Sequence, residues 1–322
     1  MTSFVLLTCA CLLADPPPRQ AVVVVVGAEG APEFVPQFRE WAKRWQTAAE
    51  QGQAEYFSIG LTPSEPATDR DVLKDRLTRL AAQETTEPLW LALIGHGTFD
   101  GKTARFNLRG PDISPADLTE WLKDARRPIA VINCSSCSSP FLNELSGPGR
   151  VVVTATKSGH EQNFARFGEY VSRALLDPQA DLDKDEQVSL LEAWLFAAAG
   201  VREFYASEGR LETEHSLLDD NGDGLGTPAD WFAGVRATKT AKGGASPDGL
   251  RASQFCLVRS RQELALPIAV RERRDQLELD LAQLRLRKAE IAEDDYLLLL
   301  EPLLLELARL YESEPIEKPP VQ

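Results

Sequence analysis

The chain has few cysteines, an excess of acidic over basic residues, and no long apolar run. Its five cysteines are too few to staple a disulfide scaffold of 322 residues. The formal net charge is -14 and no basic patch stands out, which disfavours nucleic acid and anionic membranes as partners. No segment is apolar over the length that a membrane-spanning helix needs. What is present is an apolar fraction of 43%, ample for the core of a globular protein.

Residues 1–18 have the pattern of a secretory signal segment. An apolar stretch at 4–14, too short to anchor the chain across a bilayer, is followed by three prolines. The basic residues that usually open such a segment are missing. We predict export to the periplasm or the extracellular space, with Cys11 as a candidate lipid-attachment site. If the segment is not a signal, the protein is cytoplasmic.

Apolar runs alternate with helical patterns along residues 19–260, the predicted main domain. Because continuous apolar runs between helices are typical of buried parallel strands, the pattern predicts an α/β fold. We expect a mostly parallel six-stranded sheet flanked by helices. Its predicted strands are 21–26, 54–59, 89–94, 128–132 and 151–155, with a last strand at 254–259, and its first helices are 33–51, 68–82 and 114–124.

The second half of the chain is predicted to be mostly helical. Helices are expected at about 164–176, 190–207 and 228–236, and a linker rich in Gly, Ser and Pro at 241–248. Residues 261–313 have leucines at helical spacing in two segments, which predicts a helical hairpin. It is either a coiled-coil or partner-binding arm or a pair packed on its own domain, and Pro302 is expected to kink or delay its second helix. Residues 314–322 are predicted to be a disordered tail.

Two predicted strands end in reactive side chains. The strand 89–94 leads directly into Gly95, His96 and Gly97, and the strand 128–132 leads into Asn133 and Cys134. Open α/β sheets place their chemistry at the carboxyl edge of the strands, where these ends would meet. An imidazole beside a thiol is a usual way to generate a nucleophile. The sequence therefore predicts a Cys–His dyad.

This layout resembles the caspase and legumain superfamily (clan CD) of cysteine peptidases. In that family a His-Gly pair follows the third core strand and the nucleophilic Cys follows the fourth. The resemblance implies Cys134 as nucleophile, His96 as acid and base, and the Gly97 N–H as an oxyanion donor. The segment 152–163 resembles the legumain stretch that lines the specificity pocket, which makes His160 and Glu161 pocket candidates. The resemblance implies a cysteine endopeptidase that cleaves peptides or proteins; with the signal segment and the acidic loops described below, the predicted function is an exported, calcium-binding endopeptidase.

The sequence departs from the family at the nucleophile. Counted from Ile132, the family's Cys position falls on Ser135, so Cys134 fits only with a shift of one residue. Three interpretations stay open: Cys134 is the nucleophile, Cys137 is, or the site is inactive. Cys134 and Cys137 could also pair as a disulfide in an oxidising compartment. The alternative function is an inactive caspase-like, calcium-binding protein that acts as a protein-interaction module, with the hairpin as a binding surface.

The loop at 181–192 has the ligand spacing of an EF-hand. Oxygen donors occupy the positions at which such loops bind calcium, namely Asp181, Asp183, Asp185, the carbonyl of Gln187, Ser189 and Glu192. Glu186 stands where glycine is usual. The alternative is a solvated acidic helix N-terminus, because carboxylates also complement the helix dipole.

A second such loop is found at 219–230. Its predicted ligands are Asp219, Asn221, Asp223, the carbonyl of Leu225 and Asp230, and Gly224 occupies the expected glycine position. The alternative is a plain Asp/Gly turn. We therefore predict Ca²⁺ as the cofactor of this protein and no organic cofactor.

Overall fold

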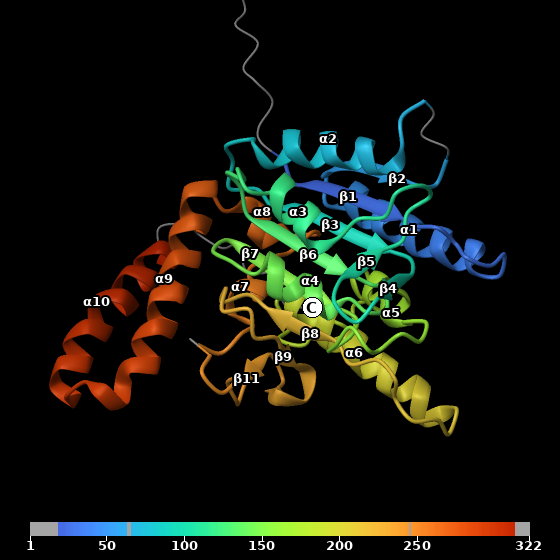
Figure 1. Ribbon diagram of the computed structural model, residues 1–322. Coiled ribbons are helices and arrows are strands. Elements are labelled where there is room, and N and C mark those ends of the chain that lie inside the picture. Colours follow the sequence, from blue (N-terminus) through green and yellow to red (C-terminus); the bar gives the residue numbers. More distant parts are fainter. Residues whose placement is uncertain (1–18, 63–65, 245, 313–322) are drawn as a thin grey trace, which may run out of the picture.

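The computed structural model describes residues 19–62, 66–244 and 246–312, and within them the chain forms a mostly parallel sheet flanked by helices (Figure 1). The sheet has seven strands in the order β2-β1-β3-β6-β7-β8-β9. In chain order these strands are β1 (Ala21–Val26), β2 (Glu55–Ile59), β3 (Leu89–Ile94), β6 (Ile129–Asn133), β7 (Arg150–Thr154), β8 (Leu217–Asp219) and β9 (Thr227–Pro228). The predicted α/β class is confirmed.

Five of the strands, from β2 to β7 in the sheet order, run parallel, and β8 and β9 add two antiparallel strands at one edge. The central strands are buried along their whole length, as in β1, where every residue is apolar and at most 2% exposed. Parallel strands covered on both faces require such continuous apolar runs, and β-branched valine suits them.

Helices cover both faces of the sheet. One face packs against α1 (Phe34–Gln51), α5 (Phe167–Ala174) and α6 (Leu190–Ser207). The other packs against α2 (Asp69–Ala81), α3 (Pro115–Trp121) and α4 (Ser139–Leu145). Alternate residues of each strand serve the two cores, so Ala130, Ile132 and Cys134 face α1 and α5, while Val131 faces α2 and α3.

Helix starts follow the capping residues in the sequence. The side chains of Thr68, Ser114 and Ser189 each accept a hydrogen bond from a backbone N–H in the first turn of α2, α3 and α6. At Ser114 and Ser189 an acidic residue three positions later completes a capping box. These local signals explain why the predicted helix at 190–207 coincides with α6.

Two predicted elements are wrong. Residues 254–259 do not form the last strand, because Gln20 Nε2 donates to the carbonyl oxygens of Cys256 and Leu257, and only Cys256 forms an isolated bridge, with Ser189. The sixth strand of the sheet is β8, and β9 follows as a seventh. Residues 228–236 are not a helix but the end of β9, a 3-10 turn (Ala229–Trp231) and the two-residue strand β10 (Phe232–Ala233), which pairs with β11 (Arg236–Ala237).

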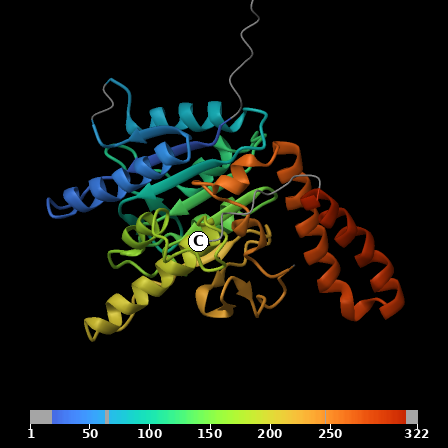
Figure 2. The same ribbon diagram turned by 180° about the vertical axis from the view of Figure 1, so that it is seen from behind.

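The C-terminal hairpin is confirmed. After α7 (Leu250–Ser253) and α8 (Arg261–Ala265), α9 (Ile268–Leu286) and α10 (Glu293–Glu312) run side by side and project from the body (Figures 1 and 2). A 3-10 turn (Arg287–Glu290) ends α9. Pro302 lies inside α10, whose start it does not delay.

The hairpin packs through a short apolar seam. Leu277, Leu281 and Leu284 of α9 and Tyr296 of α10 are buried. The predicted signal segment at 1–18 and the tail at 314–322 lie outside the described residues. Among the helices of the described ranges, none combines the length and the apolar character needed to cross a membrane.

Candidate functional site

The two strand ends expected to meet do lie side by side. β3 and β6 are parallel neighbours, with Leu93 opposite Asn133, so the residues that follow them share one edge of the sheet. On this edge β4 (Gly97–Phe99) begins directly after His96 and pairs with β5 (Ala104–Phe106). The edge therefore presents His96 and Gly97 next to the segment of residues 134–137.

His96 lies in an aromatic pocket at this edge. Its ring makes edge-on or tilted contacts with Phe34, Phe38 and Phe164, at centroid distances of 4.8, 5.4 and 5.6 Å. Its Nε2 lies 3.0 Å from the carbonyl oxygen of Glu29. Since a carbonyl only accepts, Nε2 carries the proton in this arrangement. Nδ1 is then the nitrogen that a neutral ring has available as a base.

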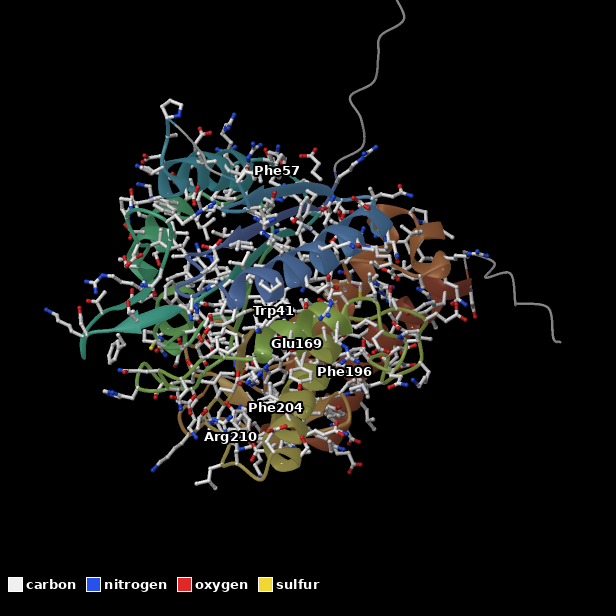
Figure 3. The ribbon with its side chains drawn as sticks, turned by 90° about the vertical axis from the view of Figure 1, so that its right-hand side faces the viewer. Trp41, Phe57, Glu169, Phe196, Phe204 and Arg210 are labelled. Atoms are coloured by element: carbon white, nitrogen blue, oxygen red, sulfur yellow. The ribbon has the colours of Figure 1, made fainter. Side chains whose placement is uncertain are left out.

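Cys134 lies in the core beside α1 and α5. The side chain is fully buried, and its Sγ has a weak contact with the carbonyl oxygen of Ile132 at 4.0 Å. A Cβ built on Gly168 of α5 would lie 2.7 Å from the Trp41 ring and 3.0 Å from Cys134 Cβ, so the packing there is tight. Figure 3 shows Trp41 on α1 beside Glu169 of α5. Burial, and then the charge of Glu214, raise the pKa of the Cys134 thiol.

Serine hydroxyls, not a thiol, lie against Gly97. The Gly97 N–H donates to Ser136 Oγ at 3.4 Å, and Ser136 Oγ donates to the Gly97 carbonyl at 3.2 Å. Ser135 Oγ donates to Asn133 Oδ1 at 2.7 Å. A Cβ on Gly97 would lie 2.1 Å from the Ser136 carbonyl oxygen, so only glycine allows this approach. The N–H predicted to serve an oxyanion is thus engaged by Ser136.

Cys137, the second candidate nucleophile, is also buried. Its backbone has a φ of 57°, a left-handed conformation that is uncommon for cysteine, and its N–H donates to the Glu161 carbonyl oxygen. Burial raises the pKa of its thiol. Cys134, Cys137 and Cys256 are all free thiols, so the alternative Cys134–Cys137 disulfide is not formed.

The two candidate pocket residues point to different partners. Glu161 Oε1 lies 2.6 Å from His215 Nδ1, and its Oε2 accepts from the Lys157 N–H. His160 is exposed and stands edge-on to Phe99, with centroids 5.2 Å apart. His215 also lines a pocket of about 380 Å³ that contains Arg202. The pairing of Glu161 with His215 brings together residues far apart in the sequence, which spacing alone does not reveal.

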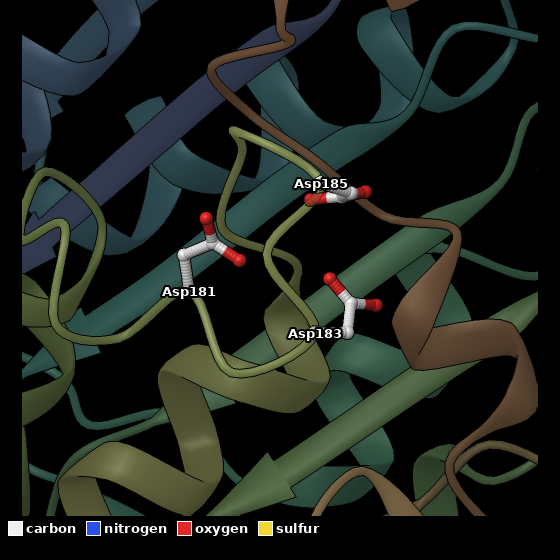
Figure 4. Close-up of side chains that lie close together, drawn as sticks. All are labelled: Asp181, Asp183 and Asp185. Atoms are coloured by element: carbon white, nitrogen blue, oxygen red, sulfur yellow. The ribbon is translucent and has the colours of Figure 1, made fainter.

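The first acidic loop gathers three carboxylates. Ligand atoms of Asp181, Asp183 and Asp185 all lie within 4.8 Å of one another (Figure 4). Burial, and then the charges of Glu192 and Asp185, raise the pKa of Asp183 to about 6. Glu186 has a φ of 69°, so it adopts the left-handed turn for which EF-hand loops use glycine. The carboxylates therefore converge as a hard cation requires.

The remaining predicted ligands of this loop take part in hydrogen bonds within it. Glu192 Oε1 accepts from the N–H of Leu182 and of Asp183, while its Oε2 accepts from the Ser189 N–H and hydroxyl. The Gln187 N–H donates to Asp185 Oδ1 at 3.1 Å. The carboxylate of Glu192 thus closes the loop onto the start of α6.

The second acidic loop repeats the backbone of the first. In both loops the fourth and sixth residues have positive φ, Lys184 and Glu186 in one and Gly222 and Gly224 in the other. In both, the first carboxylate accepts from the fourth N–H and the fifth carboxylate from the seventh N–H. These matching turns, with donors that are all oxygens, fit the chemistry of Ca²⁺.

Asp230, the predicted last ligand of the second loop, does not take part in these contacts. It is exposed in the 3-10 turn that follows β9, whereas Asp219 is 1% exposed. Leu225 is exposed, and its N–H donates to Asp223 Oδ1 at 2.8 Å. The contacts that this loop shares with the first loop thus involve its first seven positions and not the twelfth.

Glu214 is a buried carboxyl group that the sequence did not single out. It is 1% exposed, and its oxygens accept from the N–H of Arg166 and of Phe167 at the start of α5. Burial raises its pKa to about 7. A single Glu in a polar segment carries no sequence signal for such a role. Its position below α5 places its charge near Cys134.

Comparisons with known proteins return matches among solved structures. No protein-family model matches the chain, and a search of curated proteins finds no significant match. The chain is similar to the Drosophila initiator caspase Dronc, with 12% identity, 63% of this chain and 80% of that chain covered, and a TM-score of 0.42. It is also similar to caspase-1 from Spodoptera frugiperda, with 8% identity, 63% and 86% coverage, and a TM-score of 0.41. A structure of pro-sf-caspase-1 matches at 7% identity, with 63% and 91% coverage and a TM-score of 0.41.

The two strand ends occupy the positions in the sheet that the sequence predicts. His96-Gly97 follows β3, the third strand of the central sheet along the chain, and the Cys134 segment follows β6, the fourth. Both strand ends lie on the carboxyl edge of a mostly parallel sheet with helices on both faces. This is the arrangement of strands and strand ends that the sequence resemblance implies.

Proposed function

We propose that this caspase-fold protein does not cleave peptide bonds through Cys134 and His96 but acts as a calcium-stabilised protein-interaction module. One observation carries the proposal: Cys134 is fully buried in the core, and the side chain that contacts Gly97 on the sheet edge is the hydroxyl of Ser136. A catalytic thiol must be partly exposed and readily deprotonated. The alternative, a cysteine endopeptidase that uses this dyad, requires Cys134 to leave the core.

The thiol of Cys134 is expected to be unreactive in the folded protein. Its raised pKa and complete burial leave little thiolate and no access for a reagent. Labelling with iodoacetamide at neutral pH, read per cysteine by mass spectrometry, is expected to modify Cys134 no faster than Cys256, another buried thiol. His96→Ala is expected to leave that rate unchanged.

The peptidase alternative gives the opposite pattern. Fast labelling of Cys134 that is lost in His96→Ala, together with cleavage of a peptide library that is abolished by Cys134→Ala, would refute the proposal. Unfolding in urea serves as the positive control, because it exposes every cysteine to the reagent.

The surface of α10 supports an interaction role. Leu297, Leu298, Leu304 and Leu305 are between 44% and 68% exposed and line a groove of about 670 Å³. They share the side of α10 turned away from the seam with α9, since four-residue and seven-residue steps return to one helix face. Contiguous exposed apolar surface of this kind marks protein-binding sites. The proposed partner is a protein with an apolar surface of its own.

Calcium is expected to stabilise the folded protein through the loop at 181–192. A ligand that binds only the folded state adds about 2.7 kcal/mol at a concentration of roughly 100 times its dissociation constant. We expect calcium to raise the melting temperature, a chelator to reverse this, and Asp181→Asn with Asp183→Asn to remove most of the response. Asp294→Asn with Asp295→Asn removes the same charge from the start of α10 and serves as the matched control.

An equal response in the two double variants would mean that calcium acts through general charge and not through this loop. We also propose that the protein is exported. Export agrees with calcium binding, since calcium outside the cell is abundant enough for weak sites. The segment on which export depends, 1–18, lies outside the described residues.

A further inference from the structure

In the second acidic loop the carboxylate at the twelfth position, Asp230, does not close the ring, and another carboxylate stands in the corresponding place. In the first loop Glu192 closes the ring by contacts of which three have counterparts in the second loop. It accepts from the N–H of the second residue, Leu182, at 2.7 Å, and of the third residue, Asp183, at 3.2 Å, and from the hydroxyl of the ninth residue, Ser189, at 2.8 Å.

Asp248 makes the same three contacts in the second loop. Its Oδ1 accepts from the N–H of the second residue, Asp220, at 3.0 Å, and of the third residue, Asn221, at 3.2 Å. Its Oδ2 accepts from the hydroxyl of the ninth residue, Thr227, at 2.5 Å. Asp248 is 4% exposed, whereas Asp230 is exposed on the 3-10 turn.

The chain fixes Asp248 there by a reciprocal exchange of hydrogen bonds. The carboxylate of Asp220 accepts from the N–H of Gly249 at 3.0 Å and of Ala252 at 2.7 Å, which caps α7. Asn221 Nδ2 donates to the Ser246 carbonyl oxygen. Two aspartates that each accept backbone N–H groups from the other's segment lock the end of the 241–248 linker onto the loop.

One buried carboxylate oxygen of this loop has no hydrogen-bond partner among the described residues. Asp219, its first residue, is 1% exposed, and its carboxylate faces the loop because Oδ1 accepts from the Gly222 N–H. Its Oδ2 is buried without a hydrogen-bond partner in the described part of the chain. Buried carboxylate oxygens are normally satisfied, so this one favours a cation in the loop, although the Ser146 hydroxyl and the Gly224 N–H also contact the carboxyl group.

We propose that the second loop binds a divalent cation, calcium by its all-oxygen donor set, and that Asp248 and not Asp230 is its closing carboxylate. The other ligands are Asp219, Asn221, Asp223 and the carbonyl of Leu225. This inference rests on the proposed calcium binding and deepens it. Its consequence is that a residue outside the EF-hand-like motif completes the site, so calcium ties α7 to the central sheet through β8.

Calorimetric titration of the full chain with calcium tests the assignment. The wild-type protein is expected to bind two ions, Asp248→Asn and Asp219→Asn one each, and Asp230→Asn two. Retention of two sites in Asp248→Asn, or loss of one in Asp230→Asn, would overturn the role of Asp248. Asp183→Asn is expected to lose the ion of the first loop only. If the wild-type protein binds no calcium, the proposed calcium binding fails as a whole; if only the second-loop variants behave differently from expectation, the ligand assignment in that loop is wrong.

A purely structural role of Asp248 is separated by two further measurements. Thr227→Val removes the hydrogen bond to Oδ2 but keeps the carboxylate, and it is expected to retain two sites. Circular dichroism of each variant without calcium checks that the fold persists. If Thr227→Val loses a site as Asp248→Asn does, the loss follows from a loosened loop and the proposal fails.

Discussion

Replacing Glu87 by alanine is expected to lower the free energy of unfolding by about 3–5 kcal/mol, as for other broken buried ion pairs. Glu87 is 5% exposed and lies just before β3. Both oxygens accept from the Arg259 guanidinium, at 2.9 and 2.7 Å, and Arg271 of α9 lies 3.6 Å away. Loss of the carboxylate leaves two guanidinium groups without their buried counter-charge at the base of the hairpin.

Urea unfolding followed by circular dichroism measures this loss, and hydrogen exchange shows whether α9 loosens first. Glu306→Ala is the matched control, because Glu306 pairs with Arg273 within the hairpin but both side chains are more than 40% exposed. Exposed pairs of this kind contribute no more than about 1 kcal/mol. Equal losses in the two variants would show that Glu87 does not anchor the hairpin to the body.

The second large effect is a decline of stability with rising pH that originates at Glu214. Burial raises the pKa of this carboxyl from 4.5 to about 7 in the folded protein. The folded state therefore holds a proton that the unfolded state has already released, so the free energy of unfolding falls as the pH rises between these two values. In total the free energy of unfolding falls by roughly 3 kcal/mol. The decline is complete once the pH is well above the folded-state pKa of about 7.

Glu214→Gln is expected to flatten this decline, because the amide oxygen still accepts from the start of α5 but does not titrate. The comparison is urea unfolding at about pH 5 and about pH 8. Glu203→Gln removes an exposed carboxylate from α6 and is expected to leave the decline in place. A wild-type protein that is equally stable at both values, or a Glu214→Gln variant with the full decline, would contradict the assignment.

Glu214 also bears on the proposed lack of thiol chemistry. A catalytic thiol is usually activated by a neighbouring positive charge. Cys134 has instead a carboxyl group nearby whose ionised form further raises the pKa of the thiol. The electrostatics of the β6 end thus agree with its packing, and both support the proposed lack of thiol chemistry at Cys134.

Much of the fold was predictable because its signals are local. The apolar runs of β1, β3 and β6 and the capping boxes of α3 and α6 depend on residues within a few positions of one another. The turn geometry of the two acidic loops is local as well, including the left-handed conformation of Glu186 in place of glycine. The predicted strand at 254–259 failed because the side chain of Gln20, distant in sequence, takes two of its carbonyl groups.

The sequence by itself determined the layers, the strand ends that carry His96 and Cys134, and the turns of both acidic loops. Only the tertiary structure decided which side of the sheet Cys134 faces directly after β6, because side chains alternate and one residue of register moves a thiol from the edge into the core. Only the tertiary structure brought Asp248 to the second loop, since hydrogen bonds between distant segments close that ring. Spacing along a chain fixes local turns, but contacts across the fold select the groups that complete a site.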